Sequence, residues 1–108
     1  MQLEDITSPF DGAVVGQVPV TKTSEIENVI TRSVKSADLW RHTPAHIRSA
    51  VLLKAAAIAD ERSEEIAQII SSENGKSLLE ARGEASRSGE IIRLAAFEGS
   101  QLYGSTLP

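Results

Sequence analysis

The chain has 108 residues, which is the length of one small domain or of part of a larger one. Its net charge of −4 argues against nucleic acid or an anionic membrane as the main partner, and the absence of cysteine excludes a disulfide, a thiolate metal site or a cysteine nucleophile within these residues. The first residues resemble no signal peptide and no apolar run approaches the roughly 18 residues of a membrane span, so we expect a cytoplasmic protein without membrane insertion.

Residues 13–20 are predicted to form a β-hairpin near the start of the chain. Two β-branched runs separated by a glycine make up this stretch, and Pro9 and the Asp11-Gly12 pair mark a turn just before it. Pro19 has no N–H to donate, so the second strand must be short or lie at an edge. Because two strands alone are marginally stable in water, the hairpin must pack against the helices or against a sheet elsewhere.

The rest of the chain is predicted to be helical, in three or four segments, because apolar residues recur every three or four positions. The expected bounds are residues 24–41, 44–61, 63–74 and 77–102. The second and third segments could form one long bent helix, but the rising polarity there favours a break near Arg62 and Ser63. Trp40 ends the apolar stripe of the first helix and is predicted to lie in the core.

Capping signals set the expected starts of the first two helices. Ser24 and Glu27 have the spacing of a capping box, in which each side chain accepts a hydrogen bond from the backbone N–H of the other residue. Thr43 is expected to cap the second helix, with Pro44 at its first position.

The junction at residues 73–84, with the sequence ENGKSLLEARGE, is predicted to end one helix and to begin the next. Gly75 suits the left-handed conformation that closes many helices, and Ser77 with Glu80 again has the spacing of a capping box. Gly83 and Gly89 lie inside the following helix. They indicate either close packing or room beside a bound molecule.

Two patterns that could carry chemistry are better explained structurally, and a third is absent. A phosphate-binding loop ending at residues 75–77 would need glycine where Ile70 stands. His42 and His46 have the spacing of some metal sites, but Pro44 between them places them across a helix start rather than on one face. A glycine-rich dinucleotide fingerprint is absent.

Taken together, the chain resembles the N-terminal part of the aldehyde dehydrogenase superfamily. The resembling pieces are SPFDGAVVGQVPV at 8–20, Ala37–Trp40 before Thr43-Pro44, the RxxxLxxAA pattern at 48–56, ENGK at 73–76, EARGE at 80–84 and YGSTLP at 103–108. Each piece is a weak motif. Their order and spacing over almost the whole chain make the match specific.

The resemblance implies an NAD(P)-dependent enzyme that oxidises an aldehyde to a carboxylic acid through a cysteine thiohemiacetal. It implies an α/β protein in which residues 1–108 are the N-terminal, mainly α part of a Rossmann-type nucleotide-binding domain. The full protein would act on a small-molecule aldehyde, bind NAD or NADP, and form a dimer or tetramer. The family's catalytic and cofactor-binding residues and its oligomerisation strands cannot be placed on this chain, so we expect a fragment that is inactive alone.

Arg87 is the one candidate substrate-binding residue. It falls where members that act on carboxylated or phosphorylated aldehydes resemble one another in carrying an arginine, whose planar fork suits such anions. The alternative, an ion pair with Glu84 or Glu90, stays open. An alternative for the whole chain is a stand-alone helical interaction or scaffold module without catalytic activity.

Overall fold

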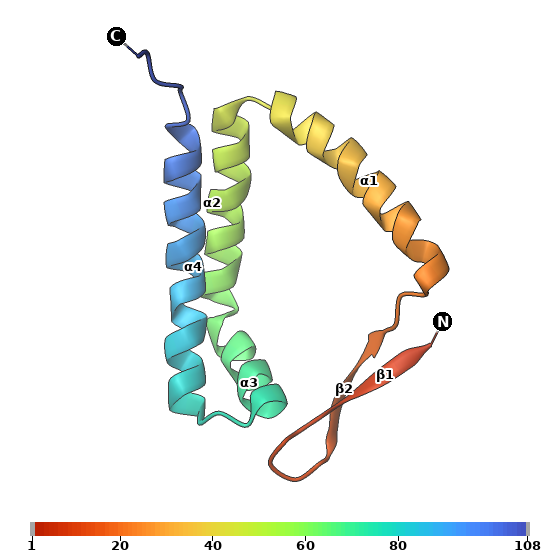
Figure 1. Ribbon diagram of the computed structural model, residues 1–108. Helices are drawn as coiled ribbons and strands as arrows, with labels where there is room; N and C mark the ends of the chain where they lie inside the picture. Colours follow the sequence, from red (N-terminus) through yellow and green to blue (C-terminus); the bar gives the residue numbers. More distant parts are fainter. Residues whose placement is uncertain (1, 108) are drawn as a thin grey trace.

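The computed structural model describes residues 2–107, and within them two antiparallel strands precede four helices, as the sequence predicts. The elements in chain order are β1 (Leu3–Thr7), β2 (Val14–Pro19), α1 (Thr23–His42), α2 (Ala45–Glu61), α3 (Ser63–Asn74) and α4 (Leu78–Ser100). Each helix begins and ends within two residues of its expected bounds. The last three helices lie together. α1 extends away from the start of α2, and the strand pair runs back from α1 towards α3 (Figure 1).

The strand pair does not lie within residues 13–20, so that part of the prediction was wrong. β1 pairs with β2 from Leu3 opposite Pro19 to Thr7 opposite Val14, and residues 13–20 therefore contribute only one strand. The first strand could not be predicted because its sequence, LEDIT, contains two acidic residues, which are depleted in strands. It is extended through its pairing with β2 and not through its own preference.

The loop of residues 8–13 forms the predicted turn. The N–H of Gly12 donates to the carbonyl of Ser8 at 2.8 Å, and Gly12 has a φ of 74°, which favours glycine. This loop lies against the corner between α3 and α4, where a Cβ placed on Gly75 would come within 2.8 Å of Cγ of Pro9. The hairpin therefore touches the helical part of the molecule at that corner.

The helical part is held together by small residues. α2 and α4 run side by side in opposite directions, and α3 packs against the start of α4 (Figure 1). Small side chains let the helix backbones approach closely, and no large side chain among the described residues is fully buried. The buried residues are Ala56, Ala67, Ala81, Ala85, Gly89 and Ala96.

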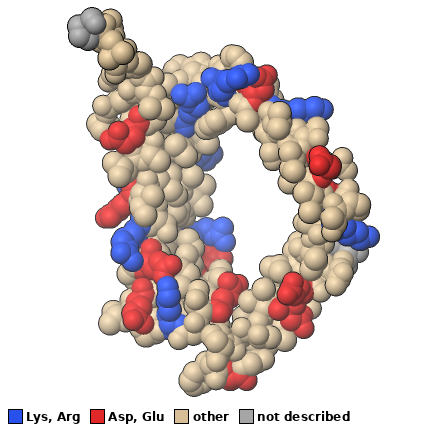
Figure 2. All heavy atoms as spheres, in the orientation of Figure 1, with Lys and Arg blue, Asp and Glu red and all other residues tan. Residues whose placement is uncertain are grey.

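None of the residues of α1 is buried. Trp40, predicted to lie in the core, is 45% exposed, so that prediction was wrong. The apolar stripe of α1 does face one side, but α1 packs along its length against no other helix of residues 2–107. In the space-filling view an opening separates α1 from the pair α2 and α4 (Figure 2).

The starts of α1 and α2 differ slightly from the predicted caps. α1 begins one residue before Ser24, and the carboxylate of Glu25 accepts from the N–H of Lys22 at 3.3 Å, so the predicted pairing of Ser24 with Glu27 was wrong. The hydroxyl of Thr43 donates to the carbonyl of Leu39 at 3.0 Å. It therefore binds the last turn of α1 and does not cap α2, which Pro44 directly precedes.

Candidate functional site

The candidate site is an open depression of about 560 Å³ at the start of α4. Its lining residues recur at intervals of three or four positions or lie next to one another, which places them on one face of the helix and on the corner before it. Acidic and basic side chains lie together at the end of the molecule where α3 meets α4 (Figure 2). The lining residues are Lys76, Glu80, Gly83, Glu84 and Arg87.

The corner before α4 is fixed by backbone and side-chain hydrogen bonds. Gly75 has a φ of 72° and closes α3, as predicted. The hydroxyl of Ser77 accepts from the N–H of Glu80 at 3.3 Å, and the carboxylate of Glu80 accepts from the N–H of Ser77 at 3.2 Å, which confirms the predicted capping box. The Ser77 hydroxyl also donates to Oε2 of Glu80 at 2.7 Å, and this hydrogen bond is the main reason why the pKa of Glu80 lies below its usual value. The first turn of α4 is thus set in place.

Lys76 and Glu84 form an ion pair inside this depression. The ammonium of Lys76 donates to Oε2 of Glu84 at 2.5 Å. This hydrogen bond, followed by the charge of Lys76, lowers the pKa of the Glu84 carboxyl, and the charge of Arg87 adds a weaker effect in the same direction. Glu84 is therefore ionised at neutral pH and already has a partner.

Arg87, the predicted substrate-binding residue, lines the depression and has no carboxylate partner among residues 2–107. The ion pair with Glu84 or Glu90 that the sequence left open is not formed. The other two arginines of α4 are both engaged: Arg82 binds Glu64 of α3 through two hydrogen bonds of 2.8 and 2.9 Å, and Arg93 binds Asp60 of α2 at 2.6 Å. Arg87 is thus the arginine of this helix that is open to an anionic ligand.

The two interior glycines of α4 have different surroundings. One lies in a close helix contact and the other beside open space, which are the two explanations that the sequence suggested. A Cβ placed on Gly89 would lie 1.9 Å from Oδ1 of Asp60 and 3.3 Å from the carbonyl oxygen of Ala56, so glycine there permits close packing of α2 on α4. A Cβ placed on Gly83 would meet nothing within 4 Å. Gly83 therefore leaves room in the depression next to Arg87.

Sequence reasoning did not assign Lys76 and Glu84 to the candidate site. In the sequence Lys76 is part of the helix junction, and Glu84 was considered only as a possible ion-pair partner of Arg87. Their spacing of eight residues, with a helix start between them, was the available signal. This spacing alone does not predict contact between Lys76 and Glu84. The contact depends on the left-handed turn at Gly75, which directs Lys76 back over α4.

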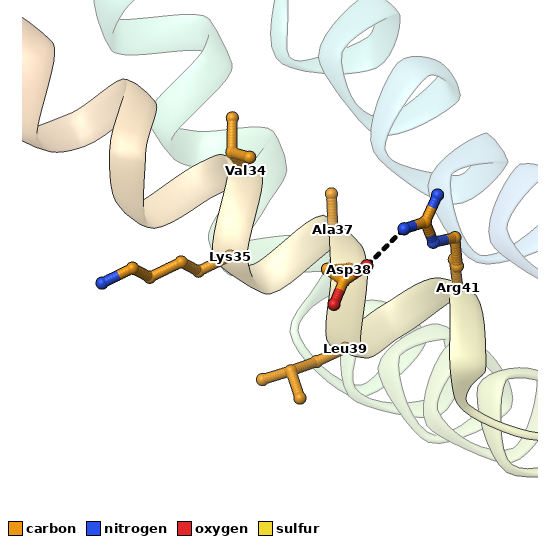
Figure 3. Close-up of a pocket in the computed structure, with 6 residues that line it drawn as sticks. All are labelled: Val34, Lys35, Ala37, Asp38, Leu39 and Arg41. Carbon is orange, nitrogen blue, oxygen red and sulfur yellow. Dashed lines mark hydrogen bonds and ion pairs between the residues drawn. The ribbon is translucent and has the colours of Figure 1, made fainter.

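Another hollow lies along α1, but its side chains do not form a binding site. It measures about 830 Å³, but all its lining residues come from one helix. Figure 3 shows that Val34 and Ala37 point to one side of α1 and Lys35 and Leu39 to another, so these side chains do not converge on a ligand. Asp38 and Arg41, also shown there, form an ion pair with each other.

The described residues show no arrangement for binding a cofactor or metal ion. No group of three or more potential metal ligands occurs in residues 2–107. No strand there leads through a glycine-rich turn into a helix, which is the arrangement that holds a dinucleotide pyrophosphate. Within the same residues, no helix combines the length and apolar character needed to cross a membrane.

The same hairpin and helices occur in solved dehydrogenases. Aldehyde dehydrogenase 21 of Physcomitrella patens, solved in complex with the reaction product succinate, superposes with a TM-score of 0.93 at 34% identity, over 99% of this chain and 22% of that chain. An NADP-dependent glyceraldehyde-3-phosphate dehydrogenase of Bacillus halodurans C-125, solved with NADP, gives a TM-score of 0.92 at 32% identity, over 98% of this chain and 22% of that chain. This chain therefore has the fold of the corresponding segment of those two dehydrogenases.

The chain belongs to the aldehyde dehydrogenase family, whose family model matches residues 2–108. Among the curated relatives, glutarate-semialdehyde dehydrogenase of Pseudomonas putida is 34% identical over 103 residues, which make up 95% of this chain and 22% of that protein. The chain thus spans 22% of the length of the curated relatives that it matches.

Proposed function

We propose that this chain is the N-terminal part of the nucleotide-binding domain of an NAD- or NADP-dependent aldehyde dehydrogenase. The observation that carries the proposal is a family match along the whole chain that spans only 22% of the curated relatives. The full enzyme would convert an aldehyde, water and NAD(P)⁺ into a carboxylic acid, NAD(P)H and a proton. Because residues 1–108 contain no cysteine, the nucleophile of the thiohemiacetal would lie outside them, and these residues alone would be inactive.

The exposed surface supports a role as part of a larger protein. The radius of gyration is 18.6 Å, whereas a compact chain of this length has about 13 Å. The accessible surface is 8561 Å², against about 5,800 Å² for a compact protein of this mass. The excess has the size of the area buried in permanent interfaces, roughly 2,000 to 5,000 Å². This surface, together with the family match, favours the dehydrogenase over a stand-alone helical module.

The substrate class that fits the candidate site is an anionic aldehyde, such as a semialdehyde with a terminal carboxylate. Arg87 supports this proposal because its guanidinium has no carboxylate partner among residues 2–107 and lies beside the space left by Gly83. A guanidinium binds a carboxylate or phosphate through two parallel hydrogen bonds. Of the three similar proteins described above, one is named for a semialdehyde, one was solved with the dicarboxylate succinate as its reaction product, and one is named for a phosphorylated aldehyde.

Cellular location and assembly are part of the same proposal. We expect the full enzyme to be cytoplasmic and to form a homodimer or homotetramer. Membership of the family and the family resemblance of the sequence support both expectations.

The test is a kinetic comparison in the longer polypeptide that carries this sequence. We expect it to reduce NAD⁺ or NADP⁺ with succinate semialdehyde, and Arg87→Ala to lower the ratio of kcat/KM for succinate semialdehyde over butanal about tenfold or more, because one charge-assisted anion contact is lost. Arg82→Ala is the matched control. Arg82 lies on the same helix but binds Glu64, so its removal should leave this ratio unchanged. An unchanged ratio in Arg87→Ala would exclude the anion-binding role.

A further inference from the structure

We propose that Lys76 is a positioning residue that keeps Arg87 open to the anionic end of a substrate by holding Glu84 away from it. This inference rests on the proposed function of Arg87. It adds a residue that would not touch the substrate, and it gives the ion pair at the corner of α3 and α4 a role in specificity.

Glu84 is the natural intrahelical partner of Arg87. The two residues are three positions apart on α4, a spacing at which a carboxylate and a guanidinium on a helix surface pair readily. They line the same depression, and the charge of Arg87 is close enough to contribute to the lowered pKa of Glu84. Without a competing cation, Glu84 would therefore neutralise Arg87.

Lys76 is that competing cation, and its backbone is fixed. The N–H of Gly75 donates to the carbonyl of Ser71 at 2.9 Å, and the hydroxyl of Ser71 donates to the carbonyl of Lys76 at 2.8 Å. Ser77 is held next to it by the capping box. The ammonium thus comes from a corner that is already ordered and binds Oε2 of Glu84 at 2.5 Å. A cation on an ordered backbone loses less conformational freedom on pairing than one on a mobile loop, because the backbone is already fixed.

Glu90, the other acidic residue three positions from Arg87, does not pair with it either. Arg93 lies three positions further along α4, and its pKa is raised chiefly by the hydrogen bond to Asp60 and to a lesser extent by the charge of Glu90. Glu84 is thus paired with Lys76, and Glu90 lies close enough to Arg93 to contribute to its raised pKa. Of these two acidic residues, only Glu84 forms a direct ion pair with its cation, which is Lys76. The proposal therefore concerns Lys76.

The experiment compares Lys76→Met and Glu84→Gln in the longer polypeptide, with succinate semialdehyde and butanal as substrates. We expect Lys76→Met to raise KM for succinate semialdehyde about two- to fivefold, the range of one exposed ion pair, because Glu84 then competes for Arg87. Glu84→Gln removes the competitor, so it should leave that KM unchanged or lower it. In an Arg87→Ala background, both substitutions should lose their effect on the substrate preference.

Each alternative gives a different result. If the ion pair is only a brace for the corner, Lys76→Met and Glu84→Gln will raise KM together, which overturns the proposal. If Lys76 attracts the substrate directly, its effect will persist in the Arg87→Ala background, which also overturns it. If Arg87→Ala alone leaves the preference unchanged, the proposed anion-binding role of Arg87 fails and this inference fails with it. Should Lys76→Met not fold, a raised KM in Glu84→Gln alone would exclude the proposal.

Discussion

At the scale of single residues, the two interior glycines of α4 separate backbone preference from packing. Either glycine costs α4 about 1 kcal/mol relative to alanine, because glycine loses more freedom in a helix. At Gly83 nothing offsets this cost, since the space beside it is open. At Gly89 a methyl group would collide with Asp60, whose carboxylate is held by Arg93 at 2.6 Å and cannot move away freely.

We therefore expect opposite effects of the same substitution at these two positions. Gly83→Ala should raise the free energy of unfolding by up to about 1 kcal/mol, whereas Gly89→Ala should lower it by about 1 to 3 kcal/mol, as overpacking does. Urea unfolding followed by circular dichroism measures both. Each variant is the control for the other. Equal effects would mean that α2 and α4 do not approach as closely as described.

At the scale of elements, α3 and the start of α4 are joined by ion pairs that depend on pH. Glu64 binds Arg82 and Glu84 binds Lys76, and in each case the hydrogen bond from the cation lowers the pKa of the carboxyl. A carboxyl with a lowered folded-state pKa stabilises the fold fully above its unfolded value, about 4.3. This contribution is lost as the pH falls through the lower folded value.

The thermal midpoint should therefore fall as the pH is lowered from 6 to 3, and it should fall less in a Glu64→Gln, Glu84→Gln variant. The pH dependence is weaker because the variant has lost two groups that take up protons on unfolding. Its midpoint at pH 6 should already be lower than that of the wild type, because it has also lost the two ion pairs. Because these side chains are about half exposed, 1 M NaCl should weaken the difference at pH 6. A variant whose midpoint depends on pH as steeply as the wild type would contradict this account.

The elements that could be predicted from the sequence are those with local signals. Gly75 and the pair Ser77 and Glu80 fix the junction of α3 and α4 through contacts within a few residues, and the structure has the same junction. β1 lacks such a signal, since it depends on pairing with residues of β2 that lie 7 to 16 positions further along the chain. Arg87 came from a family resemblance, whereas its relation to Lys76 depends on a turn geometry that spacing alone does not give.

At the scale of the whole molecule, the sequence predicts which apolar residues share a helix face, but many of these residues remain exposed because nothing in residues 2–107 packs on them. Helical periodicity shows which residues share a face and cannot show what packs on it. On α1, the exposed fractions of Ile26, Ile30 and Val34 are 45%, 50% and 65%. Apolar surface of this extent on a protein usually marks contact with another protein surface.

The isolated 108-residue polypeptide should therefore self-associate through these faces. Sedimentation velocity should show a weight-average mass that rises with concentration, and the double variant Ile30→Glu, Val34→Glu should raise the dissociation constant about tenfold or more, because unpaired charges in an apolar contact cost more than about 1.4 kcal/mol. Neither side chain is buried within the chain, so its helix content should not change.

Lys35→Glu is the matched control for this double variant. The net charge changes by −2 in both cases: the control replaces one positive charge by a negative one, and the double variant adds two negative charges. The side chain of Lys35 points to a different side of α1 from that of Val34 (Figure 3). The control should therefore leave the association nearly unchanged. If the control weakens association as much as the double variant, net charge and not the apolar face governs it. A wild-type polypeptide that stays monomeric at every concentration would show that these faces do not drive self-association.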